Sequence, residues 1–355
     1  MSQGIVARSL QAVSAEGIIA DPRWFPVDLD RETGGILFTD VSNKRHPDFR
    51  DMRSEATKPD VVLPPDAAFR LISSQQFQPR INFIWHTAWC CSTAIAHALD
   101  VPGRCLSLQE PQIMNSVARA RRESDLARRG DISWVSDVVF RLMARSTVKD
   151  APVTVKAAPV ANYLVGDALA KTHGKMLFLY SDCREFLLAV MRHDEFRRHF
   201  VRGLFGFLVD EGGSGRWSPH AIARMTDLEI AGLVWMLQME KFAHDIKRCG
   251  GRAASLDCAL FIENPRGVLR ALWRFFEMPG QVEDSDAFRD EGFFNRHLTY
   301  PGENFTLALR RDAMDGLSPR LREQIEKIAK SSIALLPRGA LPLPNPLMTV
   351  ENYAA

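Results

Sequence analysis

The chain lacks a cysteine pattern of the kind that binds metals. Six cysteines occur in 355 residues, with neither a CxxC motif nor the spacing of a metal site. They are Cys90, Cys91, Cys105, Cys183, Cys249 and Cys258. Several stand at strand ends or in apolar runs, which favours a reduced intracellular protein over a disulfide scaffold.

An excess of charge and a long apolar run are also missing. The formal net charge is +2, so composition gives no general attraction to nucleic acid or to a membrane surface. No run approaches the roughly 20 apolar residues of a membrane helix, and MSQGIVARSLQAVSAEGIIADPRW has no signal-peptide core. We therefore expect a soluble cytoplasmic protein without a membrane span or a nucleic-acid polymer as partner.

What the sequence does contain is a regular alternation of strands and helices from residue 81 onwards. Short apolar runs predict strands over 81–86, 104–108, 153–157, 175–181 and 252–258. This order predicts an α/β fold of three layers, a parallel sheet with helices on both faces. Right-handed crossovers place the C-terminal strand ends at one edge, where ligands bind, so we expect the turns there to line one cleft.

Helical patterns fill the intervals between the strands. They are predicted from about residue 92, over 132–146, over 161–174, over 183–205, from 226 to about 248, and over 264–278. Gly174 is a C-cap signal, TDLE at 226–229 is a capping box, and Pro265 suits a first helical turn.

The remaining segments divide the chain into three parts. Residues 1–75 mix turn formers with a strand candidate at 36–39, and indicate an N-terminal arm or small cap. Residues 76–335 form the α/β domain, and 336–355 form a proline-rich tail that lies extended. Within the main domain, 119–130 holds five arginines, which fit either a solvated helix face or a substrate-steering patch.

The turn between the first strand and its helix has the outline of an anion site. A helix's first amides lack intrahelical acceptors, and the peptide dipoles leave partial positive charge there. A strand, a tight turn and a helix beginning with Ser92 and Thr93 can therefore bind phosphate or sulfate. The two hydroxyls can cap the helix or donate to the anion.

This turn and the segments after it resemble the sulfotransferase superfamily. The nucleotide-binding loop of that family, Thr/Pro–Arg/Lys–Ser–Gly–Ser/Thr–Thr, is matched by the turn of INFIWHTAWCCSTAIAHALD. Its Arg-Glu-Pro, Lys–small-Pro and 3′-phosphate segments resemble LSLQEP, VTVKAAPVANYL and FLYSDCREFLLAVMRH. Its late strand with Glu-Asn-Pro, and its Arg-His-x-Lys loop, resemble SLDCALFIENPRGVLRALWRFFEMP and FFNRHLTYPGENF. The resemblance covers about residues 80–310 and rests mainly on order and spacing.

The chain departs from the family mostly at charged and glycine positions. The substituted positions are Trp89, Cys90 and Cys91 in the loop, Gln109 before the glutamate, Ser181, Cys183 and Ala189 in the 3′-phosphate segment, and Thr299 in the last loop. Each lost cation removes a charge-assisted hydrogen bond worth roughly 1.5–3 kcal/mol. Arg104, Lys156, Arg184 and Arg192 are substitute cations in the same segments.

The resemblance implies an activity and a set of site residues. The activity is transfer of a sulfuryl group from 3′-phosphoadenosine 5′-phosphosulfate (PAPS) to a hydroxyl or amine of a small-molecule or carbohydrate acceptor, without a metal. The implied catalytic residues are Glu110, as general base, and Lys156. The implied nucleotide-binding residues are Thr87, Trp89, Cys90, Cys91, Ser92, Thr93, Arg184, Arg296 and His297.

Each main candidate also has a purely structural interpretation. Glu110 can be a helix N-terminal glutamate beside Pro111, and Lys156 an ordinary cation at a strand end. Trp89 can stack on adenine or plug the site. His86 can be a base or a capped neutral histidine.

The two adjacent cysteines open a further alternative. A thiol at a helix N-terminus can be nucleophilic. A cysteine phosphatase loop needs arginine six residues later, where this chain has Ala96 and His97, so that mechanism is excluded. Small buried thiols that fill a tight turn are the favoured interpretation. For the whole protein, the alternative to an enzyme is a non-catalytic member of the fold whose degenerate nucleotide site serves as a binding module.

Overall fold

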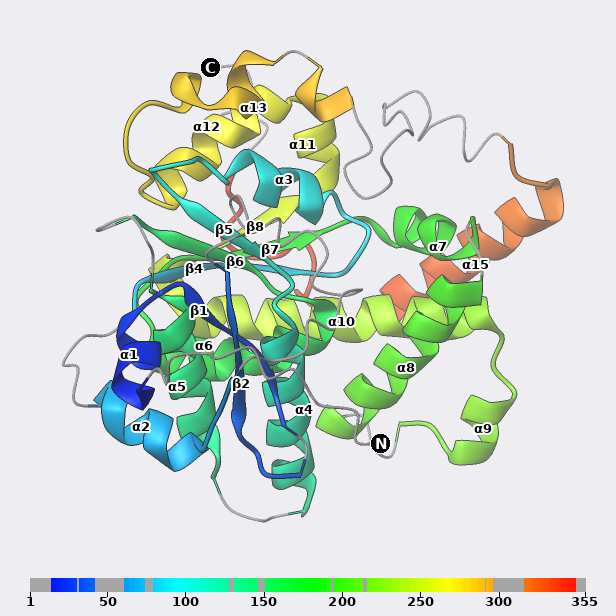
Figure 1. The fold of residues 1–355 in the computed structure, drawn as a ribbon. Helices are drawn as coiled ribbons and strands as arrows, with labels where there is room; N and C mark the ends of the chain where they lie inside the picture. Colours follow the sequence, from blue (N-terminus) through cyan, green and yellow to red (C-terminus); the bar gives the residue numbers. More distant parts are fainter. Residues whose placement is uncertain are drawn as a thin grey trace, which may run out of the picture.

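A five-stranded parallel sheet forms the centre of the protein (Figure 1). The computed structural model describes residues 14–30, 32–41, 61–73, 79–127, 131–145, 151–192, 195–212, 216–290, 292–295 and 316–348. The sheet has the order β5–β6–β4–β7–β8, with β4 (Ile81–His86), β5 (Leu106–Gln109), β6 (Val153–Lys156), β7 (Met176–Tyr180) and β8 (Ala253–Asp257). All four pairings are parallel, which confirms the predicted fold class.

Helices cover both faces of this sheet (Figure 1). One layer contains α4 (Gln112–Ala127), α5 (Ser133–Met143), α6 (Val165–Lys171) and α10 (Asp227–Cys249), and the other contains α3 (Ser92–Ala98), α11 (Cys258–Glu263), α12 (Pro265–Phe275) and α13 (Asp286–Arg289). Alternate strand residues enter alternate cores. Phe83 and Trp85 of β4 belong to the first core, whereas Ile84 between them belongs to the second. The uninterrupted apolar strands follow from this two-sided burial.

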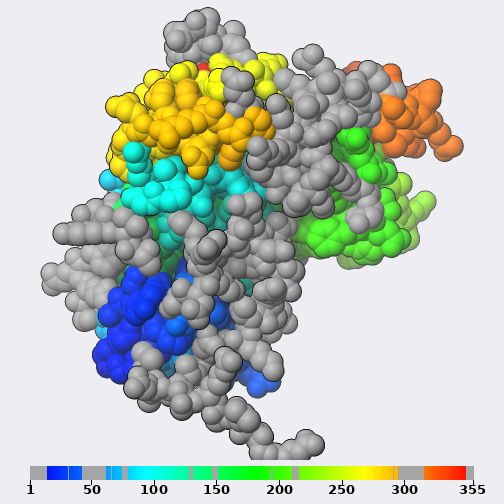
Figure 2. Space-filling view, turned by 45° about the horizontal axis from the view of Figure 1, so that its top comes forward, coloured from blue at the N-terminus to red at the C-terminus, as the bar shows by residue number. Residues whose placement is uncertain are grey.

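The central strand β4 lies where the strand order reverses. It pairs with β6 on one side and with β7 on the other. The turn after β4 therefore lies at the switch point of the sheet, the position at which open α/β sheets bind ligands. Figure 2 shows the surface formed by the cyan residues after β4 adjoining the yellow and orange residues of α12 and α13.

Two predicted helices are wrong in their extent. The pattern over 183–205 forms two helices, α7 (Cys183–Met191) and α8 (Glu195–Gly212), and the pattern over 161–174 begins with the 3₁₀ segment η2 (Pro159–Leu164) before α6. Gly174 is not a C-cap either, because α6 ends at Lys171 and Thr172 is its cap. A Cβ on Gly174 would lie 1.7 Å from the carbonyl oxygen of Ile81, so glycine is needed for backbone approach.

Two predicted helix starts are confirmed. Thr226 and Glu229 form the predicted capping box of α10, with each side chain accepting from the other residue's backbone amide. Pro265 occupies the first turn of α12, after the Asn264 cap. None of the described helices, α10 included, is long and apolar enough to cross a membrane.

The N-terminal part forms a small antiparallel sheet of its own. Its strands are β1 (Trp24–Leu29), β2 (Ile36–Asp40) and β3 (Val61–Leu63), flanked by α1 (Ala15–Ala20) and α2 (Pro65–Ser73). Only β2 was predicted. The side chains of this part share the first core with α4 and α5, so it is packed against the main sheet's helical layer.

A partly buried arginine holds this N-terminal part against α5. Arg145 donates to the carbonyl oxygens of Leu142, Ile18 and Ile19 at 2.9, 2.9 and 2.8 Å. It also donates to those of Asp21 and Trp24 at 3.2 and 2.5 Å. Burial lowers the pKa of Arg145 to about 10, which leaves the guanidinium charged at neutral pH.

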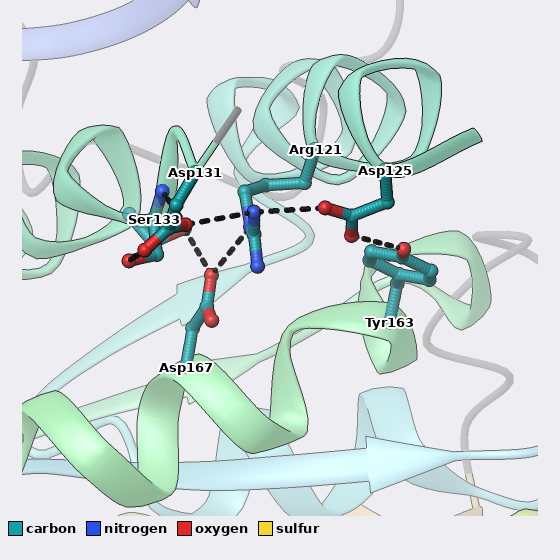
Figure 3. A network of polar contacts seen from close by, with 7 residues as sticks. Arg121, Asp125, Asp131, Ser133, Tyr163 and Asp167 are labelled. Atoms are coloured by element: carbon teal, nitrogen blue, oxygen red, sulfur yellow. Dashed lines mark hydrogen bonds and ion pairs between the residues drawn. The ribbon is translucent and has the colours of Figure 1, made fainter. Parts of the chain in front are cut away.

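The arginines of 119–130 include an internal ionic junction (Figure 3). Arg121 donates to Asp167 of α6 at 3.1 Å and to Asp125 and Asp131 at 3.2 Å each. Its side chain is only 14% exposed, so the solvated-face interpretation is wrong for this residue. The junction ties α4 to α5 and α6, and thereby fixes the helix that follows β5.

The C-terminal segments cover one side and one edge of the sheet. Helix α15 (Pro319–Ala334) packs against α7 and α10. After it, the chain runs beside the edge strand β8, where Ser255 donates its amide to Asn345 and accepts from the amide of Leu347, at 2.8 Å each. This pairing satisfies backbone groups that an edge strand would otherwise expose.

Candidate functional site

The turn after β4 has a backbone conformation that usually calls for glycine. Ala88, Trp89 and Cys91 have φ of 78°, 50° and 63°, although none of them is glycine. A non-glycine residue in this region costs on the order of 1–3 kcal/mol, and such strain gathers at functional sites. The sequence analysis missed this feature because no residue of the turn is glycine, the usual signal of left-handed backbone.

Side chains from three elements hold the turn in place. The His86 Nδ1 accepts from the amide of Ala88 at 3.1 Å. Asn162 of η2 donates to the carbonyl of His86 at 3.1 Å, and Gln238 of α10 donates to that of Thr87 at 3.3 Å. These contacts oppose the relaxation of the strained residues.

The helix after the turn starts differently from the prediction. Cys91 is the N-cap of α3 and makes no side-chain cap bond, so the Ser92 and Thr93 hydroxyls are not caps. Ser92 is the first helical residue and is buried, while Thr93 is half-buried. Among the described residues, none accepts a hydrogen bond from the backbone amide of Trp89, Ser92 or Thr93. These amides are the donors that an anion at this turn would use.

Glu110 and Lys156 meet beside the turn as an ion pair. The Lys156 ammonium donates to Glu110 Oε1, and the side chains are 2% and 13% exposed. The residues stand at the ends of β5 and β6, so the expectation that strand-end residues gather at one edge is confirmed for this pair. Glu110 also has a left-handed φ of 48°, and its amide donates to the Lys156 carbonyl at 2.7 Å. Main chain and side chain together fix the carboxylate.

The Trp89 indole lies against α7 and α8. Its ring centroid is 5.3 Å from that of Phe186 and 5.8 Å from that of Phe200. The guanidinium of Arg197 lies 5.4 Å from the indole centroid, and its Nη1 donates to the carbonyl of Ala189 at 2.7 Å. The indole thus contacts the protein's own side chains, and adenine stacking and a plug both stay predictions.

Arg197 is a residue that the sequence analysis missed. It is 6% exposed, and no carboxylate among the described residues pairs with it. Nothing in its sequence context, EFRRHF, distinguishes it from the exposed cations of an ordinary helix. Only the folded arrangement places a buried guanidinium next to the turn.

Two other candidate cations are engaged elsewhere. Arg184 pairs with Glu326 of α15 through Nε, at 2.8 and 2.7 Å, and Arg104 pairs with Asp284 at 3.1 Å. Arg296 and His297 lie outside the described residues. The described part of the predicted binding set therefore supplies one buried cation at the turn, Lys156, and its charge is balanced by Glu110.

In the segment predicted to bind a 3′-phosphate, Ser181 and Cys183 are buried, uncharged residues. Ser181 is completely buried, and its hydroxyl has no hydrogen-bond partner among the described residues. Its carbonyl accepts from the Trp235 indole at 2.9 Å. Cys183 is also buried, and burial raises the pKa of its thiol to about 12.

The two cysteines of the turn differ in burial, and Cys90 is not placed as a nucleophile. Cys90 is completely buried and donates to the carbonyl of Leu179 at 3.6 Å. Burial raises the pKa of its thiol to about 12, in agreement with the interpretation of small thiols that fill the turn. All six cysteines are free, and Cys91 is the one that is half-buried rather than buried.

This distribution predicts the outcome of thiol labelling. In the native protein at pH 8, Ellman's reagent is expected to react with at most one thiol, Cys91, and with all six after unfolding in guanidinium chloride. The variant Cys91→Ser should then show no reactive thiol in the native state. Fast native labelling of two or more thiols would contradict the burial described for the other five.

Metal-binding groups are not found at this site or nearby. Across the described residues, no cluster of three or more His, Cys, Asp or Glu side chains has a geometry that could hold a metal ion. The polar groups that the structure places at the turn are backbone amides, the Glu110–Lys156 pair, His86 and the Arg197 guanidinium.

Comparisons with other proteins find likenesses among solved structures. No family model and no curated protein matches the sequence. The fold is similar to the sulfotransferase domain from the curacin biosynthetic pathway, at 13% identity and a TM-score of 0.45, covering 73% of this chain and 99% of that one. It is also similar to the sulfotransferase domain from the Synechococcus PCC 7002 olefin synthase, at 12% identity and a TM-score of 0.40, covering 74% and 98%. Likenesses this weak carry no functional argument, so function must follow from the site's own residues.

Proposed function

We propose that the protein is a sulfotransferase-type enzyme that moves a sulfuryl group from PAPS to a hydroxyl or amine. The observation that carries this proposal is the buried Glu110–Lys156 pair at the strand ends beside a strained turn. A carboxylate held in an ion pair is in its proton-accepting form. The acceptor belongs to the small-molecule or carbohydrate class that the sequence resemblance suggests.

The chemistry requires positioning more than covalent participation by the protein. A bond forms from the sulfur to the acceptor, S–O for a hydroxyl or S–N for an amine, while the S–O bond to the phosphate breaks. The electron pair of the broken bond leaves with 3′-phosphoadenosine 5′-phosphate (PAP). The acceptor's proton passes to Glu110, and the Lys156 ammonium stabilises charge on the transferring oxygens. The amides of residues 89–93 hold the 5′-phosphate. In this assignment both residues of the pair take part in the transfer.

The compartment follows from the thiols. Six free cysteines, five of them buried, suit a reducing environment. We therefore place the reaction in the cytoplasm, where PAPS and small acceptors would meet the enzyme.

A second candidate function, that of a non-catalytic binding protein, follows from the contacts that the candidate nucleotide-binding residues already make. With Arg184 bound to Glu326 and Trp89 packed on Phe186, the nucleotide site has few charged groups to offer a dianion. A non-catalytic protein that keeps the fold and binds another partner fits these contacts. It predicts that PAP does not bind.

Calorimetric titration with PAP separates the two candidates. The enzyme proposal expects micromolar binding to the wild-type protein, which Thr93→Asp weakens at least tenfold because a carboxylate at the turn repels the phosphate. The matched control is Thr93→Asn, which has nearly the same shape without the charge and should bind within about threefold of the wild type. Wild-type binding weaker than millimolar would reject the enzyme proposal and favour the binding module.

A further inference from the structure

His86 links the strained turn to the Glu110 carboxylate through its two ring nitrogens. It is the last residue of β4, and its side chain is 3% exposed. Nδ1 accepts from the amide of Ala88 at 3.1 Å, while Nε2 lies 3.7 Å from Glu110 Oε1. The ring therefore touches the first left-handed residue of the turn on one side and faces the Glu110–Lys156 pair on the other.

The contact with Ala88 determines where the ring carries its proton. A backbone N–H can only donate, so Nδ1 must present its lone pair and cannot be protonated while this bond exists. The neutral ring then carries its hydrogen on Nε2. That hydrogen lies on the side of the carboxylate, where it meets a negative charge. In this tautomer the hydrogen faces the carboxylate, whereas the other tautomer would deprive the Ala88 amide of its acceptor and turn a lone pair toward the negative charge.

The main chain of His86 is fixed as firmly as its ring. Its carbonyl accepts from Asn162 at 3.1 Å, and the carbonyl of the next residue, Thr87, accepts from Gln238 at 3.3 Å. The ring consequently has little freedom to move without moving the turn. A displacement of the turn must displace the ring, and the ring faces the carboxylate.

We propose that His86 is a positioning residue, in the neutral tautomer with hydrogen on Nε2, that holds the anion-binding turn and Glu110 at a fixed separation. This inference rests on the proposed function and specifies how the distance between the donor site and the base is kept constant. The ring itself takes no proton from the acceptor. Because the ring contacts both, the position of the turn and the position of the Glu110 carboxylate depend on each other.

Two substitutions test the contacts of the two ring nitrogens one at a time. In His86→Asn, the amide oxygen takes the position of Nδ1 and can accept from Ala88, but nothing reaches toward Glu110. In His86→Gln, the amide nitrogen reaches the position of Nε2, but the acceptor for Ala88 is lost. The control is His97→Asn, at the histidine of α3, which the site does not use.

The tautomer is tested directly on the wild-type protein by long-range ¹H–¹⁵N NMR of its nine histidines. The His86 signals are those that disappear in His86→Asn, and they should show an unprotonated Nδ1 and a protonated Nε2. This experiment needs neither nucleotide nor activity. Hydrogen on Nδ1, or a doubly protonated ring at pH 7.5, would overturn the proposal even if the enzyme is active.

The variants test the linkage. His86→Asn should bind PAP within about threefold of the wild type while kcat falls roughly 10- to 100-fold, because the base is no longer held. His86→Gln should lose at least tenfold in PAP affinity, because the turn is no longer held. Equal effects of both substitutions, or effects no larger than those of His97→Asn, would overturn the proposal. If the wild-type protein binds no PAP, the proposed function fails, while the NMR result still decides the tautomer.

Discussion

The variant Glu110→Gln is expected to lose about 3–5 kcal/mol of unfolding free energy and to transfer sulfuryl groups 10²- to 10⁴-fold more slowly. The loss of stability follows because the Lys156 side chain, 2% exposed, loses the carboxylate that balances it in the core. The loss of rate follows because an amide cannot accept the acceptor's proton. Urea unfolding and turnover of ³⁵S-labelled PAPS measure the two effects.

The double variant Glu110→Gln with Lys156→Met separates structure from chemistry. It removes both charges, so its stability should return to within about 1–2 kcal/mol of the wild type, while transfer stays as slow as in Glu110→Gln. The matched control is the exposed pair Arg184–Glu326, whose side chains are about half exposed and whose coupling should be below about 1 kcal/mol. A double variant that recovers activity would show that the pair is only structural.

The variant Arg145→Met is expected to lose about 4 kcal/mol of unfolding free energy. Methionine fills a similar volume but donates no hydrogen bonds, so four carbonyl oxygens around the end of α1 and the start of β1, and that of Leu142 in α5, lose their charged donor. Urea unfolding measures the loss. Hydrogen exchange over residues 14–41 should accelerate before exchange in the parallel sheet, because this contact fastens the N-terminal sheet to α5.

Two further substitutions serve as controls for Arg145. Arg145→Lys keeps the charge but cannot spread its donors over five carbonyls, so about half of the loss should remain. Arg23→Met removes an exposed arginine that pairs with the carboxylate of Asp21, and should change the unfolding free energy little. A cost for Arg145→Met no larger than that of Arg23→Met would contradict the proposed fastening of the N-terminal sheet.

The parallel sheet could be predicted because its strands are buried on both faces. β4, β6, β7 and β8 appear in the sequence as short apolar runs, and the helices between them impose parallel pairing. Parallel pairing also predicted that Glu110 and Lys156 lie at one edge of the sheet, where they form an ion pair. Local cap signals such as Thr226 were equally readable, since their geometry depends on three adjacent residues.

Of the N-terminal sheet only β2 was predicted, because β1 contains a proline and β3 is a three-residue strand that pairs with a distant one. Val61 pairs with Phe38 across more than 20 residues, and Pro26 interrupts β1 at a register shift. The contacts of Arg145 and Arg197 depend on tertiary packing, which no local pattern encodes. For the turn, the sequence gives no signal of left-handed backbone, yet the surrounding hydrogen bonds hold Ala88 and Cys91 in that conformation.

The central claim is that the amides after β4 still bind the phosphate of a nucleotide without the usual cation. A crystal structure of the protein with PAP tests it most directly. The account predicts the 5′-phosphate within hydrogen-bonding distance of the amides of residues 89–93, with Glu110 bound to Lys156 and the Trp89 indole still against Phe186. An indole that fills the space over these amides, with the nucleotide absent or bound elsewhere, would contradict it.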